Sequence, residues 1–160
     1  MNITSDVTYG SHLPMLLRCV LATSGPVLEI GCGEWSTPVL NAVCRAMGRE
    51  FVSIEERPGW ATHIGTAIGI QITPPELLPH LALSKWAVVL IDNAPPEARI
   101  DDALAFADAA EFIVVHDCQY PGIVELMPFA IKQFRYHFID QSSPAETAVF
   151  SNSREIPNAA

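Results

Sequence analysis

The amino-acid sequence predicts an α/β fold in which helices cover both faces of a mostly parallel sheet of seven strands. Short β-rich runs alternate with segments of helical spacing along almost the whole chain, and this alternation is typical of α/β domains. Runs such as Val27–Ile30 and Ala87–Asp92 are apolar on both faces, as expected of parallel strands that helices cover on both sides.

The seven strands are identified by short runs rich in branched and aromatic residues. Only residues 141–146 separate the last two runs. A parallel crossover needs about a dozen residues or more, so this last pair is predicted to be antiparallel. The predicted strands are Val27–Ile30, Phe51–Glu55, Ile70–Thr73, Ala87–Asp92, Phe112–Asp117, Tyr136–Asp140 and Thr147–Ser151.

Helices are predicted where apolar residues recur on one face of a 3.6-residue period. In the segment Thr37–Met47, for example, Val39, Leu40 and Val43 share a face. Pro58 and Gly59 form a helix-start signal before the next segment. The predicted helices are His12–Ala22, Thr37–Met47, Trp60–Ile68, Pro75–Leu83, Ile100–Ala109 and Gly122–Phe134.

Composition limits the class of protein. The 160 residues, 49% of them hydrophobic, suit a single domain, which we place at residues 1–151, with a flexible tail at 152–160. No apolar run approaches the roughly 18 residues of a membrane span, and the first residues lack the pattern of a secretory leader. A formal net charge of −9 argues against nucleic acid as a partner. Four cysteines without a C-x-x-C pair favour a reduced, cytoplasmic setting.

The strongest local motif, Glu29-x-Gly31-x-Gly33, spans the end of the first strand and the turn that follows it. Ligands of open α/β sheets bind beyond this end of the strands, and glycines let the backbone turn tightly and approach a ligand closely. Ser36 or Thr37 is placed to cap the following helix. An acid at position 29 would repel the pyrophosphate that dinucleotide folds bind here, whereas it would favour an ammonium or sulfonium group. Ser36 also replaces the third glycine of the dinucleotide fingerprint.

A pair of acids, Glu55 and Glu56, ends the second strand, with Glu55 24 positions after Gly31. An acid about 20 residues beyond such a turn commonly binds ribose hydroxyls. Glu55 is therefore the preferred ribose ligand and Glu56 the alternative. The remaining interpretation is that one of them is a solvated loop charge.

Four segments together resemble the class I S-adenosylmethionine-dependent methyltransferases: LEIGCG, SIEERPGW, VLIDNAPPEAR and IVVHD. The resemblance covers residues 9–151, nearly the whole chain. It implies a Rossmann-like sheet with strand order 3-2-1-4-5-7-6, counted along the chain, and an antiparallel last strand. It also implies that Glu29 and the Gly31–Gly33 turn face the methionine part of S-adenosyl-L-methionine, and that Glu55 holds the ribose.

The same resemblance adds further residues to the predicted cofactor site. The segment YGSHLP is similar to a lead-in of one branch of the family that lines the cofactor site, which brings in His12. Cys32, Trp35 and Ser36 belong to the glycine turn itself, where Trp35 either flanks the cofactor or covers the following helix. The third strand ends in ITPPEL, without the acid that often contacts adenine, so no adenine-pocket residue is predicted.

Asp92, His116 and Asp117 end two neighbouring strands and are the predicted catalytic residues, with Asp92 also counted among the cofactor contacts. In catechol-type methyltransferases acids at these ends bind a metal together with an asparagine. Here Cys118 replaces that asparagine, and Mg²⁺ prefers oxygen ligands, so no metal is predicted. Alternatively, Asp117 or His116 is a general base. In a third interpretation, His116 bonds the neighbouring loop and Asp117 caps the next helix.

The predicted function is therefore S-adenosylmethionine-dependent methyl transfer to an unidentified acceptor, with a small molecule preferred over a peptide. No inserted segment closes the site. That absence predicts an open pocket, a homodimer whose second subunit completes the site, or a protein acceptor. Two alternatives stay open: a domain that binds the cofactor without turnover, and an NAD(P)-binding oxidoreductase.

Overall fold

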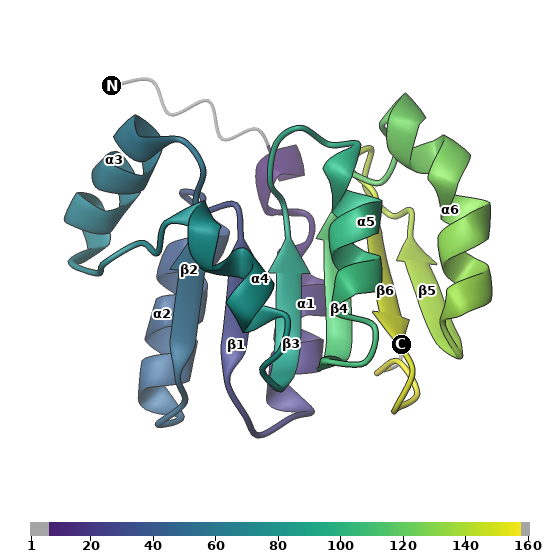
Figure 1. The fold of residues 1–160 in the computed structure, drawn as a ribbon, viewed down its shortest axis with the longest axis horizontal. Coiled ribbons are helices and arrows are strands. Elements are labelled where there is room, and N and C mark those ends of the chain that lie inside the picture. The colour runs from purple at the N-terminus through teal and green to yellow at the C-terminus, as the bar shows by residue number, and fades with distance from the viewer. Residues whose placement is uncertain (1–6, 158–160) are drawn as a thin grey trace.

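The computed structural model describes residues 7–157 and shows one six-stranded sheet in the order β2-β1-β3-β4-β6-β5 (Figure 1). All neighbouring pairs among the first four strands are parallel, and β6 runs antiparallel to both β4 and β5. The predicted fold class, the order of the strands that form and the antiparallel last strand are confirmed. The strands are β1 Val27–Ile30, β2 Phe51–Ile54, β3 Trp86–Ile91, β4 Ala110–His116, β5 Tyr136–Asp140 and β6 Thr147–Ser151.

The predicted count of seven strands is wrong, because Ile70–Thr73 does not form a strand. Thr73 makes a single parallel bridge to Ile54 of β2, which is the place that the predicted order gives to this segment. The amide of Ile70 is engaged by the carbonyl of Gly65 at the end of the preceding helix (3.0 Å). Pro74 and Pro75 follow directly and lack the N–H group that would continue a ladder. Pairing is therefore confined to one bridge.

Residues 7–157 also form six α-helices and two short 3₁₀-helices, and the first of each kind precedes β1. The predicted segment Pro75–Leu83 becomes a 3₁₀-turn followed by one turn of α-helix, and Pro58 enters its helix at the first position, as prolines prefer. The α-helices are α1 Leu13–Leu21, α2 Ser36–Ala46, α3 Pro58–Ile68, α4 Leu78–Leu81, α5 Ala98–Ala105 and α6 Pro121–Gln133, and the 3₁₀-helices are η1 Val7–Gly10 and η2 Pro75–Leu77.

The helices form two layers around the sheet. One apolar cluster joins the sheet to α4, α5 and α6, and a second joins it to α1 and α2. Figure 1 shows α5 and α6 in front of the strands and α1 and α2 behind them. Successive side chains of a strand point to opposite faces, so each strand supplies both clusters.

This alternation decides where the polar residues at the strand ends point. Val27, Leu90 and Val114 belong to the cluster on the α1 and α2 face. Two positions further along the chain, the period of two places Glu29, Asp92 and His116 on that same face. The register pairs Leu90 with Val114, so the next pair on this face is Asp92 and His116.

Residues after β6 also make contacts with the core region. Ile156 packs against the cluster on the α1 and α2 face, and Arg154 forms an ion pair with Glu111 (3.0 Å). Residues 158–160 of the predicted tail lie outside the described residues. All four cysteines are buried free thiols. Within residues 7–157, every helix is too short or too polar to cross a lipid bilayer.

Candidate functional site

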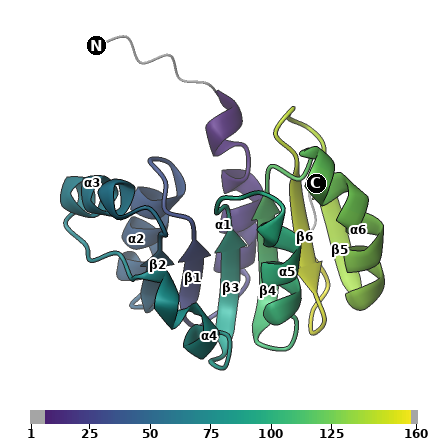
Figure 2. The same ribbon diagram turned by 45° about the horizontal axis from the view of Figure 1, so that its top comes forward.

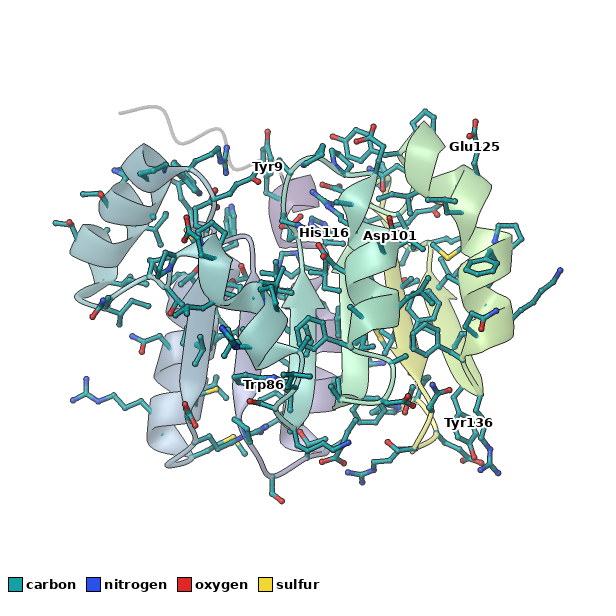
Figure 3. All side chains as sticks on the ribbon, viewed as in Figure 1. Tyr9, Trp86, Asp101, His116, Glu125 and Tyr136 are labelled. Atoms are coloured by element: carbon teal, nitrogen blue, oxygen red, sulfur yellow. The ribbon has the colours of Figure 1, made fainter. Side chains whose placement is uncertain are left out.

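The four parallel strands β1 to β4 end at one edge of the sheet, where α/β folds bind their ligands. Figure 3 shows Tyr9 and His116 at this edge, with Trp86 and Tyr136 at the opposite one. Figure 2 shows η1 and the start of α1 above the end of β3. Residues far apart in the chain therefore meet at this edge.

Two cavities flank the Gly31–Gly33 turn. The turn cavity has a volume of about 430 Å³, and the smaller edge cavity about 180 Å³. The turn cavity is lined by Tyr9, His12, Cys32, Gly33, Glu34, Trp35, Ser36, Arg57, Trp60 and Asp92. The edge cavity is lined by Ile30, Gly31, Ile54, Glu55, Glu56, Pro75, Leu78, Asn93, Ala94, Pro95, Ala98 and Asp102. A third hollow of about 440 Å³ lies beside Tyr136 and Ile156. It is at the opposite edge of the sheet from the predicted site residues.

The two glycines of the turn have different roles. Gly31 has a φ of +93°, and a Cβ atom there would lie 2.5 Å from the carbonyl oxygen of Asp92. Only glycine fits that position, because the turn crosses directly against the loop after β3. At Gly33 a Cβ atom would meet nothing closer than Ser36 Oγ, 3.5 Å away. Gly33 therefore has no steric need to be glycine within the chain, but it forms part of the cavity wall.

Glu29 lies fully buried beneath the turn and lines neither cavity. Its register partner on β2, Ser53, donates a hydrogen bond to Oε2 at 2.5 Å. Thr37 donates to the same oxygen at 2.8 Å and accepts the N–H of Gly33 at 2.8 Å. Burial raises the pKa of Glu29 to about 7, although hydroxyls, first that of Ser36, act in the opposite direction. Glu29 thus supports the turn through Thr37.

Glu55 directly follows β2 and is buried next to the turn. Its Oε1 accepts hydrogen bonds from the backbone N–H and the Nε–H of Arg57, both at 2.9 Å. Its Oε2 accepts a weak bond from the Cys32 thiol (3.7 Å), and burial raises the pKa of that thiol to about 12, so it stays protonated. Trp60 Nε1–H donates to the Cys32 carbonyl at 2.7 Å. These contacts fix the turn from the β2 side, and Glu56 stays exposed beside them.

The predicted catalytic residues form one cluster around Arg99. The Arg99 guanidinium lies 3.1 Å from Asp92 Oδ1 and 3.6 Å from Asp117 Oδ2. His116 Nδ1 faces Asp92 Oδ2 at 3.3 Å and Asp117 Oδ2 at 3.8 Å. Asp117 adopts a φ of +55°, so the chain turns sharply after His116. Of the three predicted residues, only Asp92 lines the turn cavity.

His12 and Ser11 approach this cluster from the start of α1. Ser11 Oγ lies 3.0 Å from His116 Nε2 and donates to the carbonyl of Ala145 at 2.8 Å. The His12 ring lies 4.3 Å from the His116 ring, centroid to centroid. Burial lowers the pKa of His12 to about 4, so its imidazole is neutral at neutral pH. Both of its ring nitrogens lack a hydrogen-bond partner.

The structure separates the predicted site residues into those at a cavity wall and those behind it. The turn cavity contains six of them: His12, Cys32, Gly33, Trp35, Ser36 and Asp92. The edge cavity contains Gly31, Glu55 and Glu56. Glu29, His116 and Asp117 line neither cavity. They contact residues near the cavities instead: Glu29 contacts Thr37, His116 contacts Asp92, and Asp117 contacts Arg99.

Sequence reasoning did not single out Arg57 or Arg99, although both lie in the segments that carry the resemblance. The available signal was their position, because Arg57 stands two residues after Glu55 and Arg99 follows the Asp92 loop. Tyr9, which lines the turn cavity, lies in the quoted YGSHLP segment and was not assigned either. Cys118, which stands in place of the asparagine of catechol-type enzymes, is a buried thiol that donates to the Val115 carbonyl at 3.0 Å.

No protein-family model and no curated protein sequence matches this chain. Solved structures do match it, at low sequence identity. The METTL16 methyltransferase domain has a TM-score of 0.62 and 11% identity, covering 96% of this chain and 71% of its own. The O-methyltransferase from Bacillus cereus, solved in complex with SAH, has a TM-score of 0.61 and 12% identity, covering 94% and 82%.

Human methyltransferase-like protein 13, also solved in complex with SAH, has a TM-score of 0.60 and 12% identity, covering 96% of this chain and 84% of its own. Identities this low carry the fold and not the activity. The sheet order, the helices on both faces and these matches agree with one another: the chain has the fold of the class I S-adenosylmethionine-dependent methyltransferases.

Proposed function

We propose that this protein binds S-adenosyl-L-methionine and transfers its methyl group to a small-molecule acceptor. One observation carries the proposal: the two cavities lie on either side of the Gly31–Gly33 turn, at the carboxyl edge of the sheet. The cofactor has an aromatic base at one end and a charged amino acid at the other. Two cavities joined by a glycine turn match that shape.

The walls of the cavities suit the two ends of the cofactor. The edge cavity combines apolar side chains such as Ile54 and Leu78 with the carboxylates of Glu55 and Glu56, which fits an adenine ring next to ribose hydroxyls. The turn cavity combines the open face of Gly33 with the carboxylate of Asp92. We assign the methionine part to this cavity, because a negative wall favours an ammonium or sulfonium group.

The cofactor supplies a methyl group on positively charged sulfur, so the protein's main task is to position the acceptor in line with it. An acceptor hydroxyl or amine also has to lose a proton. Among the predicted catalytic residues, Asp92 is the one at the cavity wall, and we assign it that role. His116 and Arg99 orient its carboxylate, because each contacts a different oxygen. His116 Nδ1 lies 3.3 Å from Oδ2, and the Arg99 guanidinium lies 3.1 Å from Oδ1.

A small-molecule acceptor fits the cavity and the charge. The turn cavity, at about 430 Å³, lies within the range of small-ligand sites, about 300–1,000 Å³. The formal net charge of −9 opposes binding to nucleic acid. A peptide is the alternative acceptor.

Calorimetric titration of the purified protein with S-adenosylmethionine, S-adenosylhomocysteine and NADH tests the cofactor. We expect micromolar binding of both sulfur compounds and none of NADH. Binding of NADH alone would instead support the oxidoreductase interpretation. No binding of either sulfur compound would overturn the cofactor assignment.

Turnover is tested separately, by methyl transfer from the cofactor to a panel of small hydroxyl, amine and thiol acceptors and to peptides. Transfer to any acceptor excludes a domain that binds without turnover. Asp92→Asn should then lower the rate by about 10²-fold or more, since general-base catalysis contributes about 10²–10⁴-fold. An unchanged rate would exclude Asp92 as the base.

A further inference from the structure

Three side chains from three distant segments converge beside the turn cavity, and two of them, His12 and Asp92, line its wall. His12 precedes α1, Asp92 follows β3, and His116 ends β4. One ligand-type atom from each lies within 4.8 Å of the other two. His12 and His116 are almost completely buried (1% and 2% exposed), whereas the Asp92 side chain is 24% exposed.

The hydrogen bonds of Ser11 determine which nitrogen of His116 carries a proton. The Ser11 hydroxyl donates its only proton to the Ala145 carbonyl, which can only accept (2.8 Å). Ser11 Oγ therefore accepts from His116 Nε2–H at 3.0 Å. In the neutral ring, Nδ1 then presents a lone pair to the carboxylate oxygens of Asp92 and Asp117, at 3.3 and 3.8 Å. Lone pairs that face one another require a cation between them, either a proton or a metal ion.

His12 supplies the observation that favours a metal ion over a proton. Neither of its ring nitrogens has a hydrogen-bond partner, although the residue is 1% exposed. An unpaired buried polar atom destabilises a folded protein, because it has lost its bonds to water and gained none in return. A proton shared by His116 and Asp92 would leave both nitrogens of His12 unpaired. A metal ion at the same place would accept a lone pair from His12 as well.

The spacing between Asp92 and His116 also fits an ion, and the His12 nitrogen lies within 4.8 Å of both. Two ligands each about 2.1 Å from a tetrahedral zinc lie about 3.4 Å apart. The Asp92 Oδ2 to His116 Nδ1 distance is 3.3 Å. We propose that His12, Asp92 and His116 form a binding site for one divalent transition-metal ion of the zinc type, open to the turn cavity.

The surroundings of the cluster are consistent with this ligand set. Arg99 contacts Asp92 through Oδ1 (3.1 Å), which leaves Oδ2 for the ion. The Ser11 contact to His116 Nε2–H is the supporting bond that metal-bound histidines usually make with their second nitrogen. Cys118 is excluded, since its thiol donates to Val115 and burial raises its pKa to about 12. Two imidazoles favour zinc, cobalt or nickel over magnesium.

Three protein ligands leave at least one coordination position free, as in catalytic metal sites. Since His12 and Asp92 line the turn cavity, that position opens into the cavity in which the methyl group and its acceptor would meet. A bound ion would lower the pKa of an acceptor hydroxyl, amine or thiol, and so would replace Asp92, held as a ligand, in promoting loss of the acceptor's proton. Metal binding itself does not depend on the cofactor, so it can be measured without S-adenosylmethionine.

The test is titration of metal-free protein with Zn²⁺ by calorimetry and with Co²⁺ by visible absorption spectroscopy. We expect one ion per chain, a dissociation constant of about 1 μM or lower, and cobalt d–d bands that Zn²⁺ abolishes and Mg²⁺ does not. His12→Ala should weaken binding by at least about 100-fold. Ser11→Ala should weaken it by about 10-fold, the lower end of the range for residues that support a ligand.

His63→Ala is the matched control, because His63 is 60% exposed and lies in α3, away from the cluster. Its affinity for Zn²⁺ should equal that of the wild type. The proposal is overturned if the wild type binds neither ion at about 100 μM, or if His12→Ala binds Zn²⁺ as tightly as the wild type. If His12→Ala does not fold, the Ser11→Ala affinity and the wild-type cobalt spectrum decide, and unchanged affinity in Ser11→Ala counts against the site.

Discussion

The Gly31–Gly33 turn and the cluster of His12, Asp92 and His116 lie at the same edge of the sheet, but their buried polar groups differ in how they are hydrogen-bonded. Around the turn, hydrogen bonds link Gly33 to Thr37, Thr37 to Glu29, and Trp60 to Cys32. In the cluster, both nitrogens of His12 lack partners, although the ring is buried. The turn is therefore held in shape mainly by the chain itself, although Glu29 Oε1 beneath it also lacks a partner, whereas the ion that we propose would complete the cluster.

The largest loss of stability is expected at Gly31, where the backbone of the turn lies directly against the backbone after β3. Gly31→Ala should lower the free energy of unfolding by about 4 kcal/mol or more, because its Cβ would lie 2.5 Å from the Asp92 carbonyl oxygen at a φ of +93°. Gly48→Ala is the control, since φ is also positive (+65°) but nothing lies within 4 Å of its Cβ. It should cost only about 1 kcal/mol. Urea denaturation measures both; equal losses would mean that crowding at Gly31 is absent.

The contribution of Glu29, beneath the turn, to the free energy of unfolding should depend on pH. The pKa of Glu29 is raised from 4.5 to about 7 in the folded state, so the folded protein binds the proton more tightly than the unfolded chain. The resulting stabilisation is complete below pH 4.5 and is lost as the pH rises through 7, a change of roughly 3 kcal/mol. Asp92 contributes to this shift through its negative charge.

Glu29→Gln removes this titration and keeps the shape of the side chain. Its unfolding free energy should therefore fall less than that of the wild type between pH 4.5 and 7. Denaturant titrations at several pH values give the difference between the two proteins, in which the other titrating groups cancel. Parallel curves would show that Glu29 is ionised in the folded state throughout this range.

Gly33→Val separates cofactor binding from stability. The nearest atom to the new Cβ is Ser36 Oγ at 3.5 Å, so the unfolding free energy should change by less than about 1 kcal/mol. The branched side chain would project into the turn cavity and should weaken S-adenosylmethionine by about 100-fold or more, equal to about 2.7 kcal/mol. Calorimetry measures the affinity, and retained binding would place the cofactor elsewhere.

A smaller effect is expected where the cofactor's ribose is assigned. Glu55→Ala should weaken S-adenosylmethionine by about 1.5–3 kcal/mol, the usual range for hydrogen bonds to a charged group. Glu56→Ala, at an exposed neighbour in the same cavity wall, should change affinity by less than about 0.5 kcal/mol. Calorimetry of both variants decides between the two acids, and a reversed order would make Glu56 the ribose ligand.

The fold could be predicted where local pattern and tertiary environment agree. The bounds of β1, β5 and β6 match the prediction, because each is a short β-rich run bounded by turn residues. The segment Ile70–Thr73 is also rich in β-branched residues but makes one bridge. Its failure comes from the helix that ends directly before it and the two prolines directly after it, which the composition of the run alone does not reveal.

The site could be predicted in part. The glycine motif is continuous in sequence, so the residues at its cavity walls were found from local spacing. The sequence alone did not show which residue at the end of β4 would lie beside Asp92. The observed register pairs Leu90 with Val114 and so places His116 beside Asp92. His12 reaches the site only because α1 packs across β3 and β4. The contact of its neighbour Ser11 with His116 spans 105 positions, so local spacing does not reveal it.

The positions of the tryptophans give the molecule a built-in optical signal. Of the three in the chain, Trp35 and Trp60 line the turn cavity, and Trp86 is buried at the opposite edge with its Nε1–H bound to the Leu81 carbonyl at 2.8 Å. A ligand that enters the turn cavity changes the solvent around two indoles and leaves the third unaltered. Intrinsic fluorescence of the unlabelled protein would therefore report occupancy of the cavity, with Trp86 as an internal reference.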